Sequence, residues 1–139
     1  MNSDKEKVAQ EELEKRYKKA EKLLNDNDKM EKFLQKLEKK LKTIPLAGNT
    51  LSMVPTMISL VKHYISKEYT DIPVRSIIAV IAALIYFLSP VDVIPDTIPG
   101  FGYVDDLTVI KFCLKLVDGD LKDYRSWREK NNKLVEENS

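Results

Sequence analysis

The sequence of 139 residues is poor in the residues from which many binding sites are built. It has one cysteine, Cys113, and one histidine, His63. A single cysteine excludes an intramolecular disulfide framework, and with a single histidine it also excludes the usual zinc spacings. The four glycines form no phosphate-binding loop pattern. The cysteine usage fits a reducing compartment, and we interpret His63 as a surface or partly packed histidine rather than a metal ligand.

The chain also lacks an excess of charge of either sign. Its formal net charge is +1, from 23 basic and 22 acidic residues. Because this balance gives no strong positive field, we expect no nucleic-acid partner. The first residues, MNSDKEK, carry charge without an apolar segment behind them. We therefore expect no secretory signal, and a cytoplasmic rather than a secreted protein.

Long apolar runs are scarce, and the longest has twelve residues, from Ile77 to Leu88. At about 1.5 Å per residue a helix of this length covers roughly 18 Å, whereas the hydrocarbon core of a bilayer is about 30 Å thick. The run is apolar on every face, which predicts a helix that is either central in a bundle or in contact with lipid. Pro90 and Asp92 interrupt its continuation. A core helix or a re-entrant, half-inserted hairpin therefore fits better than a straight membrane span.

Residues 1–42 contain neither glycine nor proline and are predicted to form a charged N-terminal helical arm. With 13 basic and 10 acidic residues, the arm is mildly basic. Asp28 is the candidate cap of its second helix, whose apolar stripe runs from Met30 to Leu41. Two interpretations are open: a coiled coil or membrane-surface helix, or a solvated helix packed on the domain through that stripe. Three clean heptads are absent, which weighs against a coiled coil.

A helical domain is predicted at residues 43–131, followed by a frayed polar tail at 132–139. Apolar spacing predicts one helix that ends at about Ser66, and Asp71 opens the helix that contains the apolar run. Asp105 begins a last helix, predicted to run to about Lys130 on a single apolar stripe. The predicted fold is all-α, a small bundle of about five helices with a central helical hairpin joined by a Pro/Asp-rich hinge.

The hinge, SPVDVIPDTIPGFGYVDD at residues 89–106, concentrates three of the six prolines and four aspartates. Each aspartate has a structural role available, as a helix cap or in a turn. The alternative starts from charge, because Arg75 is the only basic residue between Ile72 and Ile110. Converging carboxylates would suit a divalent cation such as Mg²⁺, Ca²⁺ or Mn²⁺. The candidate metal ligands are Asp92, Asp96, Asp105 and Asp106.

The hinge also resembles the signature of the YkvA-like family, a bacterial domain of unknown function. The pattern runs Ser-Pro, Asp, Ile-Pro-Asp, Pro, Gly-Tyr and a pair of aspartates. Besides the four aspartates, its motif residues here are Ser89, Pro90, Pro95, Pro99, Gly102 and Tyr103. The resemblance extends to Tyr69, Ile72 and Pro73 before the hinge and to Asp120, Leu121, Tyr124 and Trp127 after it. It implies a small helical domain that is often labelled a membrane protein, and it supplies no catalytic residues.

We predict from these patterns a non-enzymatic helical module at the cytoplasmic face of the membrane. Its apolar hairpin or a basic helix would dock to lipid or to a membrane protein partner. One alternative is a divalent-metal-dependent enzyme built on the four aspartates of the hinge. Another is a soluble, self-associating scaffold that uses the stripe from Met30 to Leu41. No resident cofactor is predicted, and the oligomeric state is left open.

Overall fold

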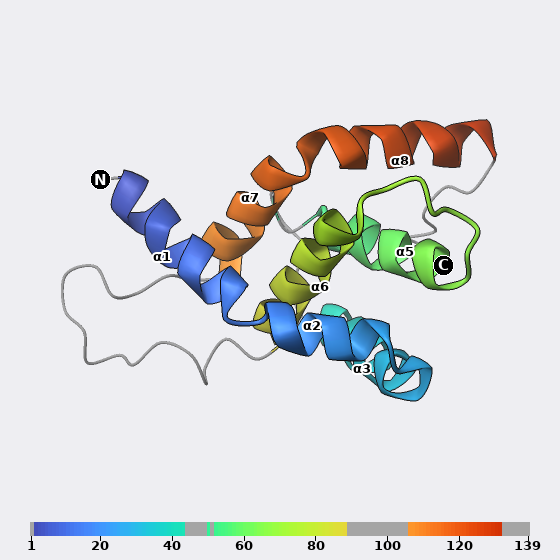
Figure 1. Cartoon of the computed structure of the whole chain (residues 1–139), viewed down its shortest axis with the longest axis horizontal. Coiled ribbons are helices and arrows are strands. Elements are labelled where there is room, and N and C mark those ends of the chain that lie inside the picture. Colours follow the sequence, from blue (N-terminus) through green and yellow to red (C-terminus); the bar gives the residue numbers. More distant parts are fainter. Residues whose placement is uncertain (1, 44–49, 51, 89–105, 132–139) are drawn as a thin grey trace.

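The computed structural model describes residues 2–43, 50, 52–88 and 106–131. These residues form helices and connecting turns without any strand, which confirms the predicted all-α class (Figure 1). The helices are α1 (Asn2–Glu14), α2 (Tyr17–Leu24), α3 (Asn27–Leu41), α5 (Val54–Ile65), α6 (Val74–Leu88), α7 (Asp106–Leu116) and α8 (Asp118–Lys130).

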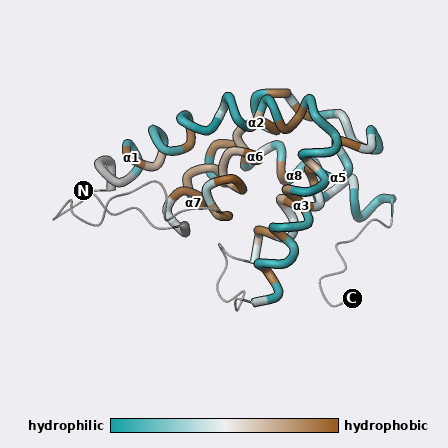
Figure 2. Tube along the Cα trace, turned by 90° about the horizontal axis from the view of Figure 1, so that it is seen from below, coloured by the Kyte–Doolittle hydropathy of each residue, from teal (hydrophilic) through white to brown (hydrophobic). Residues whose placement is uncertain are grey.

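The apolar helix α6 is the centre of the bundle. Eleven of its fifteen residues are buried, because α1, α2, α3, α5 and α7 all pack against it. In Figure 2, α6 is mostly hydrophobic and lies toward the interior, while α1 runs along the outside as a largely hydrophilic helix. Of the two interpretations of the apolar run, the structure therefore supports the core helix. No described helix has the length and hydropathy needed to cross a bilayer.

Seven described helices replace the five predicted, because two predicted helices are each divided in two. The first division lies between α1 and α2, where Arg16 has φ −102° and ψ 1°. The second lies at Val117, with φ −109° and ψ 20°, so that α7 and α8 replace the single helix predicted to run to Lys130. Val117 is buried, and the change of direction there carries Tyr124 of α8 to the side chains of α5. Periodicity alone does not reveal such a bend, since an apolar stripe can continue through it.

Two helix starts also differ from the prediction. The cap of α3 is Asp26 and not Asp28, since Asp26 has an extended backbone and its carboxylate accepts the Lys29 N–H at 3.1 Å. Asp28 instead lies in the first turn, where a negative charge favours the helix dipole. Helix α6 begins at Val74 rather than at Asp71, and the carbonyl of Pro73 accepts the N–H of Ser76 at 3.0 Å.

The apolar stripe of α3 is directed into the bundle. Met30, Phe33, Leu34 and Leu37 are all buried, and α3 contacts both α2 and α6. The packed-helix interpretation of this segment is therefore the correct one. In this arrangement these four side chains pack inside the bundle, and the self-association considered from the sequence stays a prediction.

Candidate functional site

The acidic hinge predicted from the sequence lies outside the described residues. Only Asp106 is reached, as the first residue of α7, and its side chain is not described. The capping and the metal-binding interpretations of Asp92, Asp96, Asp105 and Asp106 therefore both stay predictions. Within the described ranges, no three histidine, cysteine, aspartate or glutamate side chains are grouped so that they could hold a metal ion.

The C-terminal end of α6, which leads into the hinge, is bordered by two cations. Arg16 lies over the ring of Tyr86, with its Cζ 5.0 Å from the ring centroid, and Lys40 Nζ lies 4.5 Å from the centroid of Phe87. Lys40 also donates a hydrogen bond to the carbonyl of Phe87. Positive charge is favourable at the C-terminus of a helix, because the last carbonyls are electronegative. These two side chains therefore stabilise the end of α6.

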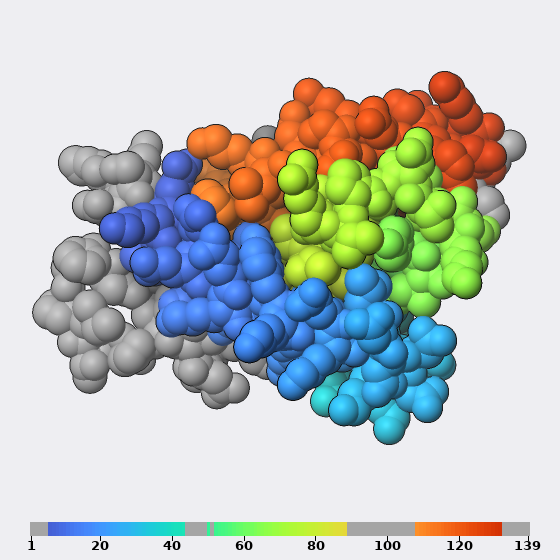
Figure 3. Space-filling model, in the orientation of Figure 1, coloured from blue at the N-terminus to red at the C-terminus, as the bar shows by residue number. Residues whose placement is uncertain are grey.

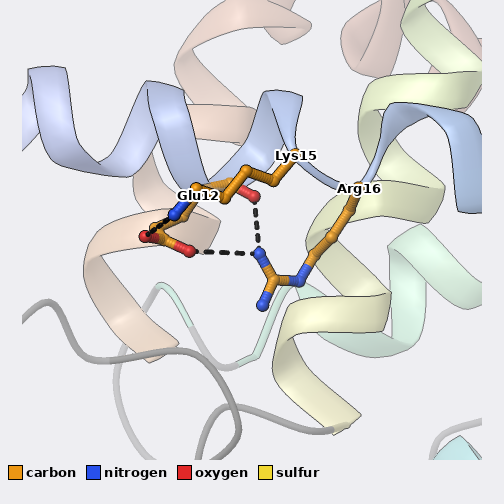
Figure 4. Close-up of polar contacts among 3 residues, drawn as sticks. All are labelled: Glu12, Lys15 and Arg16. Atoms are coloured by element: carbon orange, nitrogen blue, oxygen red, sulfur yellow. Dashed lines mark hydrogen bonds and ion pairs between the residues drawn. The ribbon is translucent and has the colours of Figure 1, made fainter. Parts of the chain in front are cut away.

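Glu12 positions Arg16 at this end of α6. Its carboxylate lies 3.2 Å from Arg16 Nη1 and 3.1 Å from Lys15 Nζ, and Arg16 Nη1 donates to the Glu12 carbonyl at 2.7 Å (Figure 4). Glu12 is only 6% exposed. A buried carboxylate needs such partners to offset the loss of hydration. Both of its oxygens are engaged by neighbouring cations, so we assign Glu12 a structural role at the junction of α1 and α2.

A second polar cluster joins α5 to α8 through the phenol of Tyr124. Its oxygen lies 2.6 Å from Ser59 Oγ and 2.7 Å from His63 Nδ1. Burial raises the pKa of Tyr124, so this phenol is neutral near pH 7. The phenol lies between serine and histidine, which therefore do not form a nucleophile–base pair. The cluster is a clasp between two helices.

Aromatic rings complete this clasp. Tyr69 lies 5.2 Å from Tyr124 and 5.1 Å from Trp127, measured between ring centroids, and His63 lies 5.2 Å from Trp127 in an edge-on arrangement. These distances are typical of favourable aromatic pairs. His63 is partly packed, as one of the two options predicted for it, and Trp127 packs beside it. The resemblance had named Tyr69, Tyr124 and Trp127 together, but spacing along the chain could not show that they meet.

The surface of the protein carries an excess of positive charge on α2 and α3. We call this segment, residues 17–42, the basic hairpin. It contains nine lysines and five acidic residues, a net charge of +4, so the remainder of the chain carries −3 of the total of +1. Eight of the lysines are exposed, and Lys40 is the partly buried one. The exposed lysines are Lys18, Lys19, Lys22, Lys29, Lys32, Lys36, Lys39 and Lys42.

These exposed lysines are absent from the ion pairs of the described residues. Among the described residues none of the eight forms an ion pair, and Glu38 of the same hairpin pairs instead with Lys62 of α5. On α3, the spacing of Lys29, Lys32 and Lys36 places them on one face, beside the buried stripe. The sequence prediction missed the strength of this feature because it counted residues 1–42 as one unit. Residues 1–16 carry −1, from four basic and five acidic residues, and dilute the charge of the hairpin.

The chain is similar to proteins of unknown function. Residues 76–112 match the model of a family described as "Protein of unknown function (DUF1232)". A relative from Bacillus subtilis (strain 168), called "Uncharacterized membrane protein YkvA", is 29% identical over 75 residues, which span 54% of this chain and 71% of the relative. No solved structure matches the chain significantly. The resemblance to the YkvA-like family predicted from the hinge is thereby confirmed.

Proposed function

We propose that this protein is a non-enzymatic helical module that binds the anionic surface of a membrane through its basic hairpin. The observation that carries the proposal is the separation of charge, with +4 on residues 17–42 and −3 on the rest of the chain. The relative's description as a membrane protein supports it. The basic hairpin is preferred to the apolar hairpin considered from the sequence, because most of α6 is buried against five other helices.

Electrostatics alone can supply useful affinity at such a surface. A lysine close to a membrane that contains anionic lipids contributes about 1 kcal/mol, and the attraction decays within a Debye length of about 8 Å at physiological salt. Lys29, Lys32 and Lys36 share one face of α3, so they can approach a flat surface at the same time.

The test is co-sedimentation with vesicles. The variant Lys29→Gln/Lys32→Gln/Lys36→Gln removes three charges from exposed positions. We expect it to bind vesicles of phosphatidylcholine and phosphatidylserine about a hundredfold more weakly than the unmodified chain, from about 1 kcal/mol for each lysine. Binding of the unmodified chain should weaken as salt is added and be lost on phosphatidylcholine alone.

A matched control removes three exposed cations from α8, as Lys122→Gln/Arg125→Gln/Lys130→Gln. Its net charge changes by the same amount, so equal loss in the two variants would show that only total charge matters. Absence of binding by the unmodified chain to either kind of vesicle would sink the proposal. Stronger binding to a nucleic acid than to the anionic vesicles would sink it too.

A further inference from the structure

A groove lined mainly by apolar side chains lies next to the basic hairpin. It lies between α2, α6 and α7 and has a volume of about 410 Å³. Its apolar lining comes from Tyr17, Ile78, Ala79, Leu116 and Val117. In Figure 3 the surface of α6 is visible between α2 and α7 on the face toward the viewer. The groove is therefore open on a side of the molecule to which the basic hairpin contributes α2.

One of the exposed apolar side chains of the described residues lies at this groove. Two large hydrophobic residues are strongly exposed, Leu116 at 54% and Val74 at 53%. Leu116 lines the groove, and Val74 precedes Arg75, which lines it as well. Leu116 thus extends the apolar lining of the groove to the exposed surface of the molecule.

Arg75 adds a cation at the edge of the groove. It is exposed, and it forms no ion pair with any described residue. Lys18 and Lys22 are exposed on the neighbouring helix α2, while Glu21 places one carboxylate at the edge. An apolar floor with an unpaired guanidinium beside it complements a ligand that has a hydrocarbon chain and an anionic head.

We propose that this groove holds an acyl chain of an anionic membrane lipid and that Arg75 binds the phosphate of its headgroup. The inference rests on the proposed function and specifies which part of the molecule enters the lipid. The basic hairpin would bring the protein to the surface, and Leu116 and Val74 would sit at the boundary between headgroups and acyl chains. This division of roles matches the way in which peripheral helices combine apolar burial with attraction to anionic lipids.

The depth of Leu116 can be measured by site-specific labelling. Cys113 is fully buried and burial raises its pKa to about 12, so its thiol does not compete for a thiol-reactive dye. A Leu116→Cys variant that carries an environment-sensitive fluorophore should brighten on vesicles of phosphatidylcholine and phosphatidylserine. It should also be quenched by lipids with a nitroxide on the acyl chain. The matched control is Ser126→Cys on the exposed face of α8, where we expect neither change.

Affinity provides the second measurement. Leu116→Glu should weaken binding to these vesicles about tenfold or more, and Arg75→Gln about fivefold. The matched controls are Ser126→Glu and Arg125→Gln on α8, which introduce the same charge changes at exposed positions. If the unmodified chain binds the vesicles but the dye at position 116 is not quenched, the groove inference is overturned and the proposed function stands. If no anionic vesicle binds the chain, both fail.

Discussion

Helices α3 and α6 have the same length and opposite characters. Each has fifteen residues, but α6 has one charged side chain and α3 has eight. Eleven residues of α6 are buried, compared with four of α3. The helix that hydropathy singles out is thus enclosed by protein, while the helix that hydropathy passes over presents the larger polar surface. An apolar helix identifies the core as readily as it identifies a membrane contact.

The difference between α3 and α6 follows from their neighbours rather than from their length. Helix α6 contacts five other helices, so an apolar side chain is favourable on nearly every face. Helix α3 contacts α2 and α6, and only its stripe requires apolar residues. The remaining positions of α3 are open to charge, and lysines occupy many of them. A surface function therefore fits α3 better than it fits α6.

We expect the largest difference between α6 and α3 in the free energy of unfolding after a substitution in each helix. Leu84 of α6 has no exposed surface, so Leu84→Ala should lower the free energy of unfolding by about 2–5 kcal/mol. Lys32→Ala on the exposed side of α3 should change it by less than about 0.5 kcal/mol. Urea denaturation followed by circular dichroism measures both. Similar values for the two variants would contradict the placement of α6 at the centre.

The dependence of stability on alkaline pH tests how completely the packing of α7 on α6 excludes solvent from Cys113. The Cys113 thiol of α7 donates a hydrogen bond to the carbonyl of Ala79 in α6, at 3.4 Å between Sγ and O. Burial raises its pKa from 9.0 to about 12. A raised folded-state pKa contributes stability in full below pH 9 and loses it as pH rises toward 12, because the unfolded chain gives up the proton first. Stability should therefore fall in this window.

The control for the alkaline experiment is Cys113→Ala. Its unfolding free energy should start lower, because a small group is lost from the core, but it should fall less steeply between pH 9 and pH 12. Some slope remains above pH 10, since burial also raises the pKa of Tyr17, Tyr69 and Tyr124. Parallel curves for the two proteins would show that solvent reaches Cys113, and that α7 does not seal α6.

We expect the smallest effect from the addition of divalent cations, whose candidate site is the hinge that follows α6. Because each of its aspartates has a capping or turn role available, we expect one melting temperature in EDTA and in Mg²⁺, Ca²⁺ or Mn²⁺. Differential scanning calorimetry on the full chain makes the measurement. A rise with one of these ions that disappears in Asp92→Asn and Asp105→Asn would instead show a cation site, and would favour the metal-dependent alternative.

Much of the fold could be predicted because it depends on local pattern. The apolar run defined most of α6, and the spacing from Met30 to Leu41 defined the buried face of α3. Such features are properties of a single helix. Hydrophobic periodicity is sufficient to reveal them, whereas the capping signals placed two helix starts incorrectly.

The bends in the helices and the contacts between different helices could not be predicted from hydrophobic periodicity. The divisions at Arg16 and Val117 depend on what the adjoining helices contact, and the clasp of Ser59, His63 and Tyr124 joins residues more than 60 positions apart. The groove beside Arg75 needs three helices at once. None of these arrangements leaves a repeating pattern in the chain.

The sequence by itself determined the helical class, the existence of an apolar helix and the family resemblance, because each is encoded in neighbouring residues. Only the tertiary structure decided that the apolar helix is enclosed and that eight exposed lysines stand free of described ion pairs. Burial and ion pairing are relations between segments. A hydrophobic run is equally favourable against protein and against lipid, so its surroundings have to be seen before its role can be assigned.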